Sequence, residues 1–189
     1  MRAFVALVPP EPAIEDLDDF LEPRREAADF RWSARDQLHV TLAFAADVPD
    51  RALDEWMERL ERAAHRRTPF DVALAGGGAF PDPARGRVLW AGLDLGPEAV
   101  TELDRLVTGA RAATSKSGID VVGRRFRPHL TLARVRHPQE LSNWVRLLDG
   151  YRGPAWTADR VTLIASHLGE GPRGRPRYQT MADFALGEA

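Results

Sequence analysis

Residues His39–Ala43 read HVTLA, and residues His129–Ala133, 90 positions further along the chain, read HLTLA. In each segment one apolar residue separates a histidine from a threonine. This alternation is typical of a strand that is buried on one face, because successive side chains of a strand point to opposite faces. We therefore expect the imidazole and the hydroxyl of each segment to share one face, while the apolar residues point into a core.

The segments on both sides of these strands are also repeated. Residues 15–21 (EDLDDFL) correspond to residues 101–107 (TELDRLV), and residues 52–60 (ALDEWMERL) correspond to residues 140–148 (ELSNWVRLL). The offsets of 86, 90 and 88 residues preserve the order and the spacing of the three matches. Such a repeat predicts two copies of one structural unit.

Hydrophobic periodicity predicts strand, helix, strand, helix, strand in both halves. In the first half the expected strands cover residues 4–8, 37–44 and 70–75, and the expected helices cover residues 12–28 and 50–67. In the second half strands at 87–95, 128–135 and 161–167 alternate with helices at 97–117 and 138–148, and a last strand covers 177–184. Asp50 is the expected N-cap of its helix, and Gly76–Gly78 is expected to form a turn.

These elements predict an α+β fold of two similar lobes related by a pseudo-two-fold axis. Each lobe is expected to be a small β-sheet with two helices on one face, with the functional site in the cleft between the lobes. We expect the 189 residues to form a single bilobal domain, with a first half of about 1–85 and a second half of about 86–189. Long helices between strands favour parallel crossovers, although the sequence leaves the strand order open.

Composition and charge exclude several classes of function. The chain has no cysteine, which rules out a thiol nucleophile, a thiolate metal site and disulfides. Its formal net charge of −2 argues against a module that grips long nucleic-acid duplexes through many phosphates. No stretch approaches the roughly 20 apolar residues of a membrane span, and the N-terminus does not read as a signal peptide. A cytoplasmic protein without a membrane partner is expected.

A cleft that holds two histidine–threonine pairs suits phosphoryl chemistry. One histidine can act as general base and the other as general acid, because imidazole titrates near neutral pH. The hydroxyls of Thr41 and Thr131 can donate hydrogen bonds to phosphate oxygens. This scheme needs no metal and no cofactor, and the symmetry of the pair does not say which histidine plays which role.

Other polar residues are weaker candidates for the functional site. Arg127 lies two positions before His129 and shares its face if Pro128 leaves the strand unbroken, which would allow a phosphate contact. His65 is expected to be exposed on a helix and His137 to lie in a loop, whereas His167 lies on a strand and is a rival. The matching Trp56 and Trp144 are expected to be core residues.

The two motifs, with their surroundings, resemble the two-histidine phosphoesterase superfamily. Residues 2–6 (RAFVA), 76–81 (GGGAFP), 87–92 (RVLWAG) and 126–134 (FRPHLTLAR) narrow the resemblance to the RNA 2′,3′-cyclic phosphodiesterase branch, also called 2′-5′ RNA ligase. One departure is Ala45-Ala46, where relatives commonly have Leu-Gly. The resemblance implies a bilobal fold, metal-free hydrolysis of 2′,3′-cyclic phosphate to 2′-phosphate, His39 as proton donor and His129 as proton acceptor. It also recommends Arg134 as a phosphate contact.

Alternative functions remain open at this point. The same site could act on small cyclic nucleotides or on ADP-ribose cyclic phosphate, and the reverse reaction would give a minor RNA 2′-5′ ligase activity. A non-enzymatic alternative is a module that binds RNA ends without significant turnover. The expected partners are RNA ends that carry a 2′,3′-cyclic phosphate, or small cyclic phosphates. A monomer without an obligate protein partner is expected.

Overall fold

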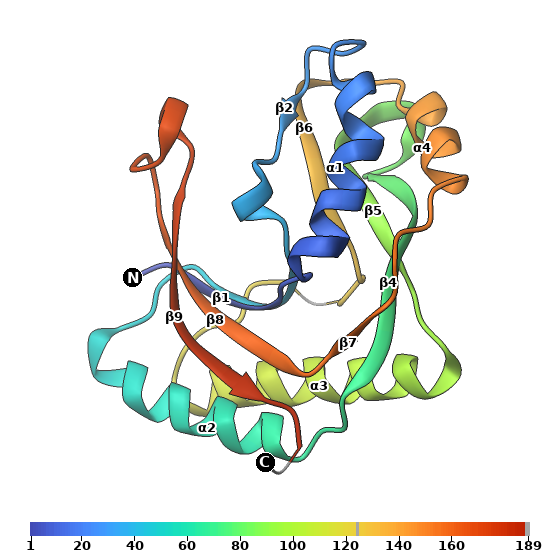
Figure 1. Cartoon of the computed structure of the whole chain (residues 1–189). Coiled ribbons are helices and arrows are strands. Elements are labelled where there is room, and N and C mark those ends of the chain that lie inside the picture. The colour runs from blue at the N-terminus through green and yellow to red at the C-terminus, as the bar shows by residue number, and fades with distance from the viewer. Residues whose placement is uncertain (124, 188–189) are drawn as a thin grey trace.

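The computed structural model describes residues 1–123 and 125–187 (Figure 1). In this part of the chain nine strands form one antiparallel sheet. The strands are β1 (Ala3–Leu7), β2 (Arg31–Trp32), β3 (Val40–Ala45), β4 (Phe70–Phe80), β5 (Gly86–Asp94), β6 (Leu130–Gln139), β7 (Trp156–Ala158), β8 (Arg160–His167) and β9 (Arg177–Ala185). The helices are α1 (Glu11–Arg25), α2 (Leu53–His65), α3 (Pro97–Lys116) and α4 (Ser142–Asp149).

The strand order reflects the internal repeat. The order is β7-β4-β5-β6-β3-β1-β8-β9, with β2 attached to β6. In the internal repeat β1 corresponds to β5, β3 to β6 and β4 to β8. Corresponding strands therefore lie at equal distances on the two sides of the β6–β3 junction. The expectation of parallel crossovers is wrong, because every pairing is antiparallel. The third strand of each half crosses into the other lobe, so each lobe contains strands from both halves of the sequence.

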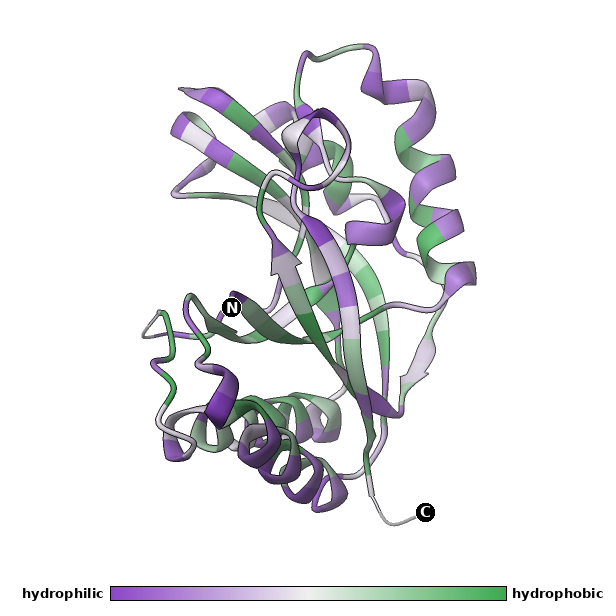
Figure 2. Ribbon diagram, turned by 90° about the vertical axis from the view of Figure 1, so that its left-hand side faces the viewer, coloured by the Kyte–Doolittle hydropathy of each residue, from purple (hydrophilic) through white to green (hydrophobic). Residues whose placement is uncertain are grey.

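The helices cover the two lobes in the same crossed manner. Helices α2 and α3 pack against each other beneath β3 and β9, whereas α1 and α4 pack against β4 (Figure 1). In Figure 2 the hydrophobic faces of α2 and α3 point toward the sheet and their hydrophilic faces point outward. Trp56 of α2 is fully buried, as expected, and its Nε1 donates a hydrogen bond of 3.0 Å to Thr114 Oγ1 of α3. None of the helices in the described part of the chain is long and apolar enough to cross a membrane.

The glycine run lies inside a strand, so the prediction of a turn is wrong. Strand β4 continues through Gly76–Gly78 to Phe80, and its register with β5 shifts between Leu74 and Gly77. Gly76 has a φ of +65° at this bulge, a conformation that favours glycine. A Cβ atom on Gly77 would lie 2.7 Å from the carbonyl oxygen of Trp90. The run therefore permits a bend and a close approach of β4 to β5.

Two helix starts also differ from the prediction. Asp50 lies in a 3₁₀ turn whose N-cap is Pro49, and α2 begins at Leu53 without a side-chain cap, so Asp50 does not cap the helix. Helix α4 begins at Ser142, because Pro138 is still part of β6. The loop 169–176, which is rich in glycine and proline, connects β8 and β9 as a hairpin.

We expect Gly77→Ala to lower the free energy of unfolding by about 1–3 kcal/mol, the usual cost of overpacking, because its Cβ would meet a backbone oxygen. Gly109→Ala in α3 is the matched control, since its Cβ would lie 3.5 Å from Ala63 Cβ, an ordinary contact. That change removes a glycine from a helix and should stabilise by roughly 0.5–1 kcal/mol. Thermal and denaturant unfolding check both values. Equal effects of the two substitutions would show that the close approach at Gly77 is not needed.

Candidate active site

The two histidines lie at the junction of the two lobes. Val40 of β3 pairs with Leu130 of β6 in antiparallel register, and His39 and His129 each come directly before this pair. Both therefore precede the first residue of their strand, whereas the sequence places them inside strands 37–44 and 128–135. The pairing nevertheless brings the two motifs together at the centre of the sheet.

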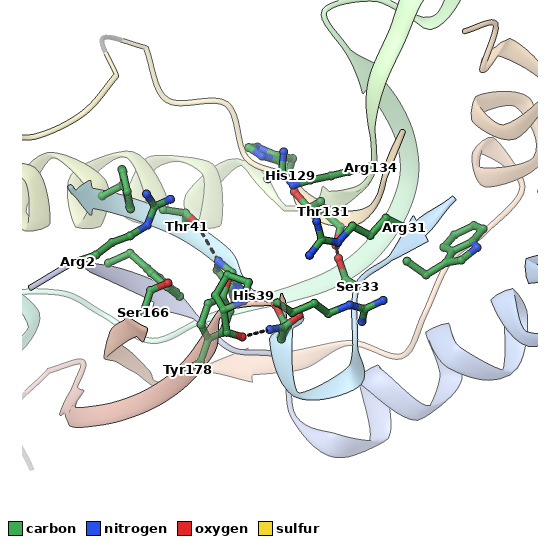
Figure 3. Close-up of a pocket in the computed structure, with 16 residues that line it drawn as sticks. Arg2, Arg31, Ser33, His39, Thr41, His129, Thr131, Arg134, Ser166 and Tyr178 are labelled. Atoms are coloured by element: carbon green, nitrogen blue, oxygen red, sulfur yellow. Dashed lines mark hydrogen bonds between the residues drawn. The ribbon is translucent and has the colours of Figure 1, made fainter. Parts of the chain in front are cut away.

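One cavity contains both motifs. It has a volume of about 550 Å³ and is lined by His39, Thr41, His129 and Thr131 (Figure 3). This volume lies within the range of ordinary small-ligand sites. Both threonine side chains are partly buried, so the structure places the two histidine–threonine pairs around one space.

The ring of His39 is held in one orientation. Its Nδ1 lies 2.7 Å from the carbonyl oxygen of Gln37, and a carbonyl only accepts, so Nδ1 carries the proton in the neutral ring. Nε2 lies 3.0 Å from Thr41 Oγ1, and the hydroxyl donates to this nitrogen when the ring is neutral. The ring stacks on Phe4 with centroids 4.5 Å apart and meets the ring of Tyr178 edge-on. Because Nδ1 is held by the backbone, Nε2 is the ring nitrogen that can exchange a proton with a ligand in the cavity.

His129 is held by the same kind of hydrogen bond to a backbone carbonyl. Its Nδ1 lies 2.7 Å from the carbonyl oxygen of Arg127, also two residues upstream. Its ring contacts Phe80 edge-on at 4.8 Å and Trp90 at 6.1 Å between centroids. The backbone contact again protonates Nδ1 and leaves Nε2 without a proton in the neutral ring. The internal repeat thus conserves both the tautomer and the anchoring contact of the two histidines.

Burial favours the neutral form of both histidines in the free protein. Burial lowers the pKa of His39 from its ordinary 6.5 to about 4, with smaller contributions from the charges of His129 and Arg134, and the hydrogen bond to Gln37 opposes this shift. Burial also lowers the pKa of His129, again with a contribution from Arg134. A histidine that donates a proton from this site must therefore gain that proton when an anion binds, because negative charge favours the imidazolium.

Four arginines line the cavity around the histidines. They are Arg2, Arg31, Arg134 and Arg175. Within the described residues that line this cavity there is no aspartate or glutamate. None of the four forms an ion pair within residues 1–123 and 125–187. Although the protein has a net charge of −2, the lining of this cavity is positively charged, which suits an anionic ligand.

Arg31 and Arg134 are directly opposite each other. They are cross-strand partners in the β2–β6 pair, and both are exposed. Like charges in this position repel and destabilise a sheet. An anion between the two guanidinium groups would relieve that repulsion, so this pair supports anion binding independently of the histidines.

Only one of the two arginines that the sequence predicts as phosphate contacts lines the cavity. Arg134 lines the cavity, whereas Arg127 is exposed, and its guanidinium lies 5.9 Å from the centre of the Phe80 ring. Sequence reasoning missed Arg2, Arg31 and Arg175, together with other lining residues that include Ser33, Ser166 and Tyr178. Only Arg2 carried a signal, because it comes directly before β1 and precedes the lining residue Phe4 by two positions.

The other three histidines lie outside this cavity. His65 is exposed at the end of α2, and His137 is exposed in the last residues of β6. His167 Nε2 lies 3.0 Å from Gln179 Oε1, so its ring contacts a β9 side chain and not the cavity. In the described part of the chain no three aspartate, glutamate, cysteine or histidine side chains gather as metal ligands would.

We expect the ring of His39 to titrate near pH 4 in the free protein, and the ring of His129 below its ordinary value. Inorganic phosphate should raise both pKa values, because the bound anion favours the protonated rings. By linkage, phosphate should then bind more tightly as the pH falls toward these values. NMR titration of the ring resonances, with and without phosphate, measures this. A His39 that titrates at 6.5 in the free protein would contradict the burial argument.

Comparisons with known proteins agree with this geometry. Residues 9–170 match the family model of the 2′-5′ RNA ligase superfamily. An Aquifex aeolicus relative named RNA 2′,3′-cyclic phosphodiesterase is 30% identical over 158 residues, which cover 83% of this chain and 82% of the relative.

Solved structures show the same fold. A Thermus thermophilus protein aligns with a TM-score of 0.78 and 27% identity over 100% of both chains. Escherichia coli LigT complexed with 3′-AMP aligns with a TM-score of 0.75 and 25% identity, over 99% of this chain and 98% of that chain. These two-lobed neighbours and the sequence match lead to one conclusion: the chain belongs to the 2′-5′ RNA ligase superfamily.

Proposed function

We propose that the protein hydrolyses RNA 2′,3′-cyclic phosphate ends to 2′-phosphomonoesters, with His39 as general acid and His129 as general base. The observation that carries this proposal is the matched pair of imidazoles in one cavity, each with Nδ1 bound to a backbone carbonyl. The name of the Aquifex aeolicus relative supports the substrate, and the LigT complex with 3′-AMP supports a nucleotide ligand.

The reaction uses the two Nε2 atoms, because both Nδ1 atoms are held by backbone carbonyls. His129 Nε2 accepts a proton from a water molecule whose oxygen attacks phosphorus. The bond between phosphorus and the 3′ oxygen breaks, and His39 donates its Nε2 proton to that oxygen, which becomes the 3′-hydroxyl. The phosphate stays on the 2′ oxygen. Solvent then restores the two protonation states, so one water molecule is consumed and no cofactor or metal is required.

The arginines and threonines supply binding and charge stabilisation. Substrate phosphate brings the negative charge that lets His39 become protonated despite its burial. Thr131 donates a hydrogen bond to a non-bridging oxygen. Thr41 does the same once His39 Nε2 is protonated, because that nitrogen then no longer accepts from the Thr41 hydroxyl. Arg134 faces the same oxygens with Arg31. We assign no such role to Arg127, because its guanidinium lies over Phe80. The division into acid and base follows the family resemblance.

We expect His39→Ala and His129→Ala each to lower turnover by about two to four orders of magnitude, the usual contribution of general acid–base groups. A substrate whose leaving group is a nitrophenol separates the two roles, because this group departs without a proton. It should restore turnover strongly in the variant without the acid, His39→Ala, and weakly in His129→Ala. The exposed His65→Ala is the control and should behave as wild type.

The outcomes of this assay are distinct. Rescue of His129→Ala alone would reverse the two roles, and equal responses of the two variants would contradict the division of labour. The same assays test metal independence when they contain excess EDTA. Wild-type turnover should survive, since the two imidazoles carry both proton transfers. Loss of wild-type turnover in EDTA, restored by one specific divalent ion, would contradict metal independence.

A further inference from the structure

A second, larger cavity adjoins the catalytic one. This outer groove has a volume of about 920 Å³, and its walls come from residues 27–31, from the later part of β6 and the start of α4, and from Arg173 of the β8–β9 hairpin. It shares Arg31 and Arg134 with the catalytic cavity. The opposed arginine pair therefore stands between the two spaces and faces both.

The outer groove carries unpaired positive charge beyond this pair. Arg136 and Arg173 line it, both are exposed, and neither forms an ion pair among the described residues. Asp29 and Glu140 also line it. The Glu140 carboxylate accepts a hydrogen bond of 2.9 Å from the backbone N–H of Ser142. Together with Arg31 and Arg134, arginines outnumber carboxylates along this wall.

Three aromatic rings also border the two adjoining cavities. Trp32 lines the catalytic cavity, whereas Phe30 and Trp144 line the outer groove. The three rings contact one another with centroids 5.4–5.5 Å apart, and all three are only partly buried. Trp144 was expected to be a core residue. Its position shows instead a ring that packs on the core and also borders the groove.

A basic groove on another face of the protein lacks these features. It lies between α2 and α3 and is lined by several arginines and Lys116, without an aromatic residue. Arg59, Arg67 and Arg105 there contact glutamates of the same two helices. It also shares no lining residue with the catalytic cavity.

We propose that the outer groove binds the single-stranded RNA chain on the 5′ side of the cyclic end. Arg136 and Arg173 bind backbone phosphates, and a base stacks on the exposed part of Phe30 and Trp144. Arginine–phosphate contacts and base stacking on aromatic rings are the means by which proteins hold single strands. This inference rests on the proposed function, and it assigns an oligonucleotide as the preferred substrate over a cyclic mononucleotide.

Turnover tests the preference. The substrates are uridine 2′,3′-cyclic phosphate and a tetranucleotide that ends in the same group. We expect wild type to favour the tetranucleotide in kcat/KM by roughly tenfold or more, a difference worth about 1.4 kcal/mol. The double variant Arg136→Ala/Arg173→Ala should lose most of that preference. The matched control Arg62→Ala/Arg66→Ala removes the same charge from the groove between α2 and α3, and its preference should equal that of wild type.

Binding tests the groove without turnover. The probe is a fluorescein-labelled tetranucleotide that already carries a terminal 2′-phosphate, and its Kd is measured against salt concentration. Each lost phosphate contact lowers the slope of log Kd against log salt by about 0.7 for a single strand, so the double variant should lose roughly 1.4 and the control nothing.

The two readouts separate the two proposals. Equal wild-type kcat/KM on both substrates, or a salt slope that the double variant leaves unchanged, would overturn the outer groove as an RNA site. If neither substrate is hydrolysed but the salt slope falls as expected, the proposed reaction fails and the RNA site is supported.

Discussion

The two lobes meet in the sheet at one residue pair, Val40 of β3 and Leu130 of β6, and the position of both histidines depends on it. Both side chains are almost completely buried, so the junction is part of the core. Because the pairing is antiparallel, the residues that come before it on each strand lie on opposite sides of it. His39 and His129 thereby approach one cavity from two directions, each with its Nδ1 held by a carbonyl two residues upstream.

The electrostatics of the cavity follow from this burial. Partial withdrawal from water, and to a smaller extent the charge of Arg134, favour the neutral form of both imidazoles. The four lining arginines attract an anion, and the opposed pair Arg31 and Arg134 gains from its presence. In the proposed mechanism, substrate binding and protonation of His39 are therefore coupled, since the phosphate charge that attracts the arginines is also the charge that stabilises an imidazolium.

The repeat allowed much of this arrangement to be predicted. The matching His-x-Thr segments placed both histidines and both threonines at one cleft, and the apolar stripe of 50–67 predicted a buried Trp56, because local periodicity records which face is buried. The crossing of β4 and β8 between lobes escaped prediction, since strand order depends on long-range pairing. The sequence predicts a turn at the glycine run because the residue that requires these glycines, Trp90, lies on another strand and approaches them only in the folded sheet. Arg31 and Arg175 come from a two-residue strand and a hairpin loop, which have no periodicity to read.

The pH dependence of kcat/KM on a cyclic-phosphate RNA tests the paired-histidine mechanism most directly, provided that the chemical step limits the rate. The account predicts a bell-shaped profile for wild type, because one imidazole must be neutral and the other protonated. Rate falls at low pH as the base becomes protonated and at high pH as the acid loses its proton. His129→Ala should lose the fall at low pH, and His39→Ala should lose the fall at high pH. A wild-type kcat/KM that stays flat from about pH 5 to 9 would contradict the account, since the acid's loss of its proton must lower the rate within that range.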